Sequence, residues 1–412
     1  MGYPLSFVLT VLFVAYSLVT LMVISLWRKN PSIDINRITN IVNLSLCAAL
    51  SICAWFYYAP TFVDLDRMMQ EIENARVDGI SALFAEYQAQ PLSFLLLMVG
   101  YWTGDRRVLE VIGCVATYGL FMLIIMKLKE LLNPDPVTAF LGTLLFLLKP
   151  EYVTALTNIR FIVAVELLLF AFLLWIEGRK RKVSILLTVL AVLLHSGVFP
   201  LVICMVIANF ASLTVFVASC IILGGYSLFL NQITDYLVTS SITPIAMLGS
   251  RIAGYYGVGQ EQFAYDSQML AAGYSTLGER YLLLAIPIFG CYFLLKPVLS
   301  VVLPGAVEKL IISEYVFTIF SSQSYTVFIR YAYLASLLVI PVIYCCVNGF
   351  LLSSSATVPD ANPQLSHKAV TQGSLRELAL RVLFLVLVFA LAYLFLHQWG
   401  STYYNSRILI GS

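Results

Sequence analysis

The chain has 412 residues, of which 60% are hydrophobic and only 11% are charged. A soluble domain has about 25% charged residues, so the composition excludes a mainly soluble protein and predicts an all-α, polytopic integral membrane protein. The net charge of +2 is too small to indicate nucleic-acid binding. The eight cysteines form no C-x-x-C pair, and we expect them to be apolar packing residues without a zinc site or a disulfide framework.

The first third of the chain predicts two spans followed by a polar outer loop. Residues 4–27 are long enough for a span and are followed by a basic segment, which predicts a cytoplasmic loop and an N-terminus outside. Residues 38–59 return outward. Residues 60–107 then form the first outer (periplasmic) loop, with interfacial helices. Within this loop, residues 91–103 are too short to span comfortably, and we predict a re-entrant or interfacial helix there.

The middle of the chain contains the strongest orientation signal. Residues 161–177 and 183–195 are apolar, and the turn between them is Gly178-Arg179-Lys180-Arg181-Lys182. A basic turn of this kind is typical of the cytoplasmic side. The hairpin is therefore predicted to begin at Arg160 and to end at His195, with both residues near the outer face.

Two further loops complete the predicted single domain, residues 1–412. Residues 231–279 are predicted to be a second outer loop. Residues 353–376 are rich in Ser, Pro, Asn and Gln, which predicts a flexible cytoplasmic loop. The last span is residues 378–398. The sequence predicts about eleven transmembrane helices plus the short re-entrant or interfacial helix, and it contains no internal repeat.

Four arginines are predicted to lie at the outer face, against the positive-inside pattern: Arg160, Arg251, Arg280 and Arg330. Each costs about 2.5–3.5 kcal/mol if it is held at membrane depth. Snorkelling to lipid headgroups or a structural ion pair is one explanation. The other is a pyrophosphate ligand, because a guanidinium matches phosphate oxygens in bidentate fashion.

Other candidate residues have two interpretations each. His195 has an ordinary pKa of about 6.5, which suits removal of a proton from a sugar hydroxyl, but it could equally be a packing residue. Asp64 and Asp66 would share a face in an extended segment and could hold a divalent metal, whereas in a helix they would not face together. Glu166 is expected to face the protein interior with a partner. Tyr255 could stack on a sugar or belong to an interfacial belt.

Three short motifs carry a resemblance to a known family. Asn158-Ile159-Arg160 opens a long apolar helix, Leu194-His195-Ser196 follows the next apolar run, and Arg330-Tyr331-Ala332-Tyr333 opens another helix. This order, with an early loop aspartate at Asp64 or Asp66, resembles the EpsG family of Wzy-type polysaccharide polymerases. The chain departs from the family in one respect. A tyrosine commonly follows the aspartate by about four residues, and Met68 or Gln70 stands there.

The resemblance implies a GT-C-like membrane fold in the bacterial inner membrane and an active site facing the periplasm. The implied reaction joins oligosaccharide repeat units carried on polyprenyl pyrophosphate. It implies that Arg160 and Arg330 hold the pyrophosphate with Asn158 nearby, and that His195 is the base. No cofactor is implied, and a metal at the aspartates is not favoured.

The implied partners are the lipid-linked donor and acceptor, membrane lipids, a chain-length regulator and a flippase, with no nucleic acid. The alternatives are a lipid-linked oligosaccharide flippase, an O-antigen ligase and a membrane O-acyltransferase.

Overall fold

The computed structural model describes most of the chain. The residues that it describes are 2–58, 64–148, 156, 158–178, 180–255, 274–322, 324–353, 367–403 and 407–409. In chain order, the helices are α1 (Leu5–Lys29), α2 (Ile35–Trp55), α3 (Asp64–Asp78), α4 (Ile80–Glu86), α5 (Pro91–Thr103), α6 (Arg106–Leu132), α7 (Pro136–Leu148), α9 (Ile159–Glu177), α10 (Arg181–Leu194), α11 (Phe199–Phe210), α12 (Leu213–Gly225), α13 (Leu230–Val238), α14 (Thr243–Tyr255), α16 (Tyr274–Leu295), α17 (Gly305–Phe320), α18 (Tyr325–Ser353) and α19 (His367–Tyr403).

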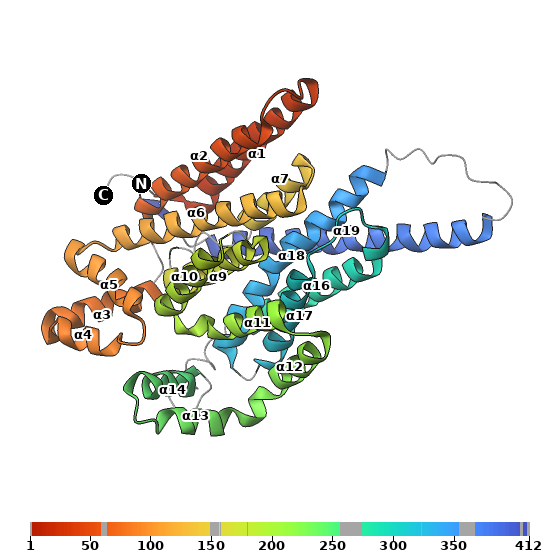
Figure 1. Cartoon of the computed structure of the whole chain (residues 1–412). Coiled ribbons are helices and arrows are strands. Elements are labelled where there is room, and N and C mark those ends of the chain that lie inside the picture. Colours follow the sequence, from red (N-terminus) through yellow and green to blue (C-terminus); the bar gives the residue numbers. More distant parts are fainter. Residues whose placement is uncertain are drawn as a thin grey trace.

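A small antiparallel sheet joins the two ends of the chain. Its strand order is β1 (Gly2–Pro4), β3 (Arg407–Leu409) and β2 (Tyr57–Tyr58). The register places Gly2 opposite Leu409, and Tyr57 opposite Ile408. The N- and C-termini therefore lie together, beside the α1–α2 hairpin (Figure 1).

Helices of membrane-spanning length confirm the prediction of an α-helical membrane protein. In the described ranges, seven helical segments are long and apolar enough to cross a bilayer: Phe7–Lys29, Ile35–Trp55, Arg106–Leu132, Ile159–Glu177, Gly278–Val298, Val327–Asn348 and Glu377–His397. Four apolar helices are shorter: Pro91–Thr103, Pro136–Leu147, Ser196–Phe210 and Leu213–Gly225. The predicted count of about eleven spans and the GT-C-like fold stay predictions.

The structure moves several predicted boundaries. The first predicted loop, 60–107, contains the three helices α3, α4 and α5, and the second, 231–279, contains α13 and α14 packed against each other. Residues 256–273 lie outside the described residues. α19 begins at His367, so the second half of the predicted loop 353–376 is helical. α18 begins at Tyr325, which places Arg330 inside the helix and not at its mouth.

Helix α9 lies at the centre of the helical bundle and is buried along most of its length. Its sequence is aliphatic or aromatic around nearly the whole circumference, and a helix of this kind is stable only when other helices surround it. α6 and α10 pack along it, and all three lie in the middle of the molecule in Figure 1. The first turn of α9 is therefore held on several sides, and this turn carries Arg160.

Helices α6 and α9 run parallel, and charged contacts mark both of their ends. At their N-terminal ends, Arg106 of α6 pairs with Asp66 of α3 at 3.5 Å. At their C-terminal ends, Lys127 of α6 pairs with Glu177 of α9 at 3.2 Å. We call the end with the Arg106–Asp66 pair the α3 end of the molecule. We call the opposite end the Lys129 end, because Lys129 lies there in the last turn of α6.

Candidate functional site

A chain of hydrogen bonds at the α3 end holds Arg160. This residue lies in the first turn of α9 and is only 4% exposed. Its Nη1 donates to the hydroxyl of Tyr87 at 2.7 Å, and this hydroxyl donates to Oε2 of Glu71 at 2.5 Å. The guanidinium carbon lies 5.6 Å from the centre of the Tyr87 ring. Tyr87 is the C-cap residue of α4, so the two loop helices α3 and α4 fix the arginine of a central helix.

Burial sets the protonation of this chain of groups. Burial raises the pKa of Glu71, although the hydrogen bond from Tyr87 and the charge of Arg160 act in the opposite direction. Burial also raises the pKa of Tyr87 well above its ordinary value. The phenol is therefore protonated near neutral pH and can donate to Glu71 while it accepts from Arg160.

His195 lies at a sharp turn between two helices. It is the C-cap residue of α10 with an extended backbone, and it begins a 3₁₀ turn, Ser196–Val198. Its Nδ1 accepts a hydrogen bond from the backbone N–H of Gly197 at 3.1 Å. A neutral imidazole with an accepting Nδ1 carries its hydrogen on Nε2. A Cβ at position 197 would lie 2.6 Å from Cε1 of His195, so an alanine there would displace the imidazole.

An aromatic ring joins His195 to Arg330. The ring of Phe161 lies 5.5 Å from the imidazole of His195, edge to face, and the guanidinium carbon of Arg330 lies 5.3 Å from the centre of the same ring. The hydroxyl of Tyr331 donates to the carbonyl of Gly197 at 2.9 Å. Since Phe161 follows Arg160 in the first turn of α9, the structure brings the turn at His195 and the start of α18 to the helix end that carries Arg160.

The short helix α5 supports the turn at His195. The hydroxyl of Ser93 donates to the carbonyl of Leu194 at 2.5 Å, and Nε2 of Gln90 donates to the hydroxyl of Ser196 at 2.6 Å. Both contacts lie next to His195 in the chain. The segment predicted as a re-entrant or interfacial helix is thus a helix that positions a candidate site residue; its place relative to the bilayer stays a prediction.

The two loop aspartates do not form the extended pair that would suit a metal. α3 begins at Asp64, and residues two apart on a helix point to different sides. Asp66 instead pairs with Arg106, which also donates to Oε1 of the buried Glu110 at 3.2 Å. The side chain of Asp64 lies outside the described residues. Within the ranges that the structure describes, no group of three His, Cys, Asp or Glu side chains is placed to hold a metal ion.

The remaining predicted residues have different positions. Asn158 is the N-cap residue of α9. Arg280 is exposed on α16. Two residues before it, Gly278 packs closely against Phe328 of α18, and Phe328 is two residues before Arg330. Arg280 and Arg330 therefore both lie close to this contact between α16 and α18. Arg251 and Tyr255 belong to α14, and their side chains lie outside the described residues.

Glu166 is buried within α9, where the sequence predicts an interior carboxylate. Sequence reasoning missed Glu71, Tyr87 and Phe161. Tyr87 is the one tyrosine in the polar segment 60–90, and that position could have singled it out. Glu71 is one of six acidic residues in the same segment, and Phe161 is one of many apolar residues, so neither had a distinguishing signal.

No protein-family model, no curated protein and no solved structure matches the chain.

Proposed function

We propose that the protein is a glycosyltransferase of the polysaccharide-polymerase kind. It would join oligosaccharide units carried on polyprenyl pyrophosphate at the periplasmic face of a bacterial inner membrane. The observation that supports this most is the buried Arg160, held by Tyr87 at one end of membrane-spanning helices and close to Arg330 and His195 through the first turn of α9. No cofactor is needed, because the sugar–pyrophosphate bond supplies the energy.

The arginines would stabilise the leaving group. In the proposed reaction the bond between the anomeric carbon and the pyrophosphate oxygen breaks, the acceptor hydroxyl forms the new glycosidic bond, and the lipid pyrophosphate leaves with the electron pair. Guanidinium groups placed where this charge develops lower the barrier. Arg160 has five N–H donors, of which Tyr87 accepts one. Arg280, Arg251 and Asn158 are proposed helpers.

His195 was expected to be the base, but its geometry favours a different role. Proton removal at Nε2 needs the tautomer with hydrogen on Nδ1, and that tautomer loses the bond from Gly197. The N–H of Gly197, which is part-buried, would then lose its acceptor, and an unsatisfied donor costs up to about 1–3 kcal/mol when it is fully buried. We therefore propose that Nε2–H donates a hydrogen bond to the pyrophosphate, and that the acceptor proton passes to water after the sugar bond has formed. Base catalysis by His195 is the alternative that the following test decides.

The test uses glycan gels from cells that lack the gene and carry the wild type, Arg160→Ala, His195→Ala or His195→Gln, with protein levels from immunoblots. We expect a ladder of polymer lengths with the wild type and single units with Arg160→Ala and His195→Ala. A glutamine amide can donate from nearly the position of Nε2 but cannot act as a base. The donor role therefore predicts a ladder with His195→Gln, and the base role predicts none.

Two outcomes would contradict the proposal. A normal ladder with Arg160→Ala at wild-type protein level excludes the pyrophosphate clamp. Loss of even the single lipid-linked unit from the outer face on gene deletion indicates a flippase. The observation that favours a flippase is the burial of Glu166 and Glu314 within α9 and α17, since carboxylates inside a membrane protein often lie on transport pathways.

A further inference from the structure

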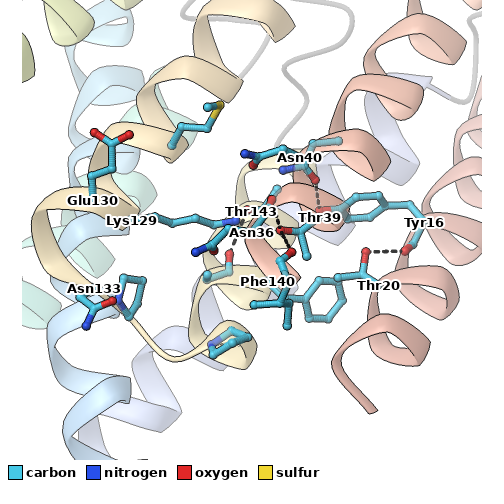
Figure 2. A pocket seen from close by; sticks show the side chains of 16 residues that line it. Tyr16, Thr20, Asn36, Thr39, Asn40, Lys129, Glu130, Asn133, Phe140 and Thr143 are labelled. Carbon is cyan, nitrogen blue, oxygen red and sulfur yellow. Dashed lines mark hydrogen bonds between the residues drawn. The ribbon is translucent and has the colours of Figure 1, made fainter. Parts of the chain in front are cut away.

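A polar cavity lies at the Lys129 end of the molecule, away from the candidate site. Its volume is about 280 Å³, and it lies between α1, α2, α6 and the start of α7 (Figure 2). Figure 2 shows polar side chains converging on it from these helices. A cavity of this size and polarity holds many water molecules or one small polar ligand.

One wall of the cavity consists of neutral hydrogen-bonding groups. Asn36, Asn40 and Asn43 recur at helical spacing along one face of α2. Asn43 is 4% exposed and its Oδ1 accepts from the hydroxyl of Tyr16 at 2.9 Å; its amide nitrogen has no hydrogen-bond partner among the residues described. Thr143 of α7 also lines the cavity, and its hydroxyl donates to the carbonyl of Ala139 at 2.9 Å. This wall suits a ligand with hydroxyl groups.

The opposite wall provides one positive charge. Lys129 reaches from α6 toward α2 (Figure 2), and its neighbour Glu130 also lines the cavity. Glu130 and Glu177 both pair with Lys127. For Lys129, no carboxylate lies within 4.0 Å in the part of the chain that the structure describes. A half-buried ammonium is costly without an opposite charge, and none of the described residues places a carboxylate beside it.

We propose that this cavity binds a phosphate ester with adjacent hydroxyl groups. Lys129 would pair with the phosphate through a charge-assisted hydrogen bond, and the asparagines would bind the hydroxyls. The cavity begins at the end of α6 and reaches inward along α2 by about 10 Å from Asn36 to Asn43, which is the depth of a lipid headgroup. A phosphoglycerol headgroup and a soluble glycerol phosphate share this chemistry.

This cavity is separate from the site at the α3 end. From Arg106 to Lys129 the axis of α6 rises by about 35 Å. No residue that lines the cavity belongs to the contacts around Arg160 or His195. The proposal therefore stands or fails independently of the polymerase proposal.

The experiment uses the purified full-length protein in a neutral detergent. Short-chain phosphatidylglycerol, short-chain phosphatidylcholine and glycerol 3-phosphate are titrated separately, and binding is measured by thermal stabilisation and by microscale thermophoresis. The variants are Lys129→Gln and Asn40→Ala, and Lys127→Gln is the matched control, because it removes a charge two residues away that already has acidic partners. We expect phosphatidylglycerol to bind the wild type and Lys127→Gln alike, and Lys129→Gln about tenfold or more weakly.

The remaining titrations distinguish a lipid ligand from a soluble one, and they include the results that would overturn the proposal. Saturable binding of glycerol 3-phosphate that needs Lys129 supports the proposal with a soluble ligand, and binding of phosphatidylglycerol alone supports it with a lipid. Asn40→Ala should weaken either ligand to a lesser degree. Equal binding of phosphatidylglycerol by the wild type and Lys129→Gln, or equal binding of phosphatidylcholine and phosphatidylglycerol, overturns it. So does the absence of binding by all three probes.

Discussion

The hydroxyl of Tyr87 connects a central helix to the loop helices around it. It accepts from Arg160 and donates to Glu71, and each hydrogen bond to a charged group contributes about 1.5–3 kcal/mol. The orientation of Arg160 is thus determined by residues about 70–90 positions earlier in the chain. A buried arginine fixed in this way is preorganised, since little side-chain entropy is left to lose when a ligand binds.

The pH dependence of stability should reveal the buried carboxyl group of Glu71. Its pKa is raised in the folded protein, so the folded state binds more protons than the unfolded state between the ordinary carboxyl value and the raised one. The free energy of unfolding therefore falls as pH rises through this window. We expect Glu71→Gln to remove this fall, so that the melting temperature of the variant rises relative to that of the wild type as the pH increases above the ordinary carboxyl pKa of about 4.3.

The comparison needs a carboxylate that lacks this burial. Glu73, two residues later, is largely exposed and pairs with Arg76 at 2.9 Å. Glu73→Gln should follow the wild-type melting curve across the same pH range. Parallel curves for Glu71→Gln and the wild type would contradict the assignment of a raised pKa.

Helix α5 is an element whose role depends on its short length. Its 13 residues rise about 20 Å, less than the hydrocarbon core of about 30 Å, and it ends in a left-handed turn at Gly104. This length allows its first turn to contact the end of α10 beside His195 while its last turn packs near α6. A helix long enough to span the membrane in the place of α5 would extend beyond the turn at His195, and its first turn could not contact it.

Ser93→Ala tests whether α5 positions the turn at His195. Ser93 is fully buried and donates to the carbonyl of Leu194, and loss of this bond should reduce the free energy of unfolding by about 1–3 kcal/mol. We expect shorter or fewer polymer chains on the glycan gel because the imidazole shifts. Thr103→Ala removes a hydroxyl from the same helix that bonds only within α5, and its gel should match the wild type.

Single elements also show what the sequence could predict. The long apolar runs of α1, α2, α6 and α9 are predictable because the bilayer sets a minimum length for a span. The sequence also predicts interfacial helices within residues 60–107, but hydropathy alone does not separate a polar helix from a polar loop, so the bounds of α3 and the presence of α13 are not predictable. For the same reason the alternative of a metal site at Asp64 and Asp66 was left open by the sequence. It required an extended backbone, and the structure has a helix there.

For the candidate site, a shared end of the helical bundle was predictable and lateral position was not. The predicted order of inward and outward spans puts Arg160, His195 and Arg330 at the same end, and the contacts of Phe161 with His195 and Arg330 agree with this; their depth in the bilayer stays a prediction. Which of them meet depends on how helices distant in sequence pack, and no local pattern contains that information. Tyr87 and Arg160, 73 residues apart, illustrate this, as does Phe161 between His195 and Arg330.

At the scale of the whole molecule, close helix crossings hold the bundle together. α7 crosses α18 at Gly142, where an added Cβ would lie 2.1 Å from a ring carbon of the fully buried Tyr344. Gly142→Ala should therefore force the two helices apart and lower the free energy of unfolding by about 1–3 kcal/mol or more. Gly119→Ala, in α6, meets no atom within 4 Å and should be neutral or slightly stabilising in the same detergent melting experiment.

The small sheet of β1, β3 and β2 has a consequence for the path of the chain through the bilayer. Open sheet edges do not occur in the hydrocarbon core, so residues 2–4 and 407–409, which are hydrogen-bonded neighbours, lie on one side of the membrane. A chain that starts and finishes on the same side crosses an even number of times. The seven long apolar helices in the described ranges are an odd number of candidate crossings, so an even total requires a further crossing segment beyond these seven, or one of the seven that does not cross.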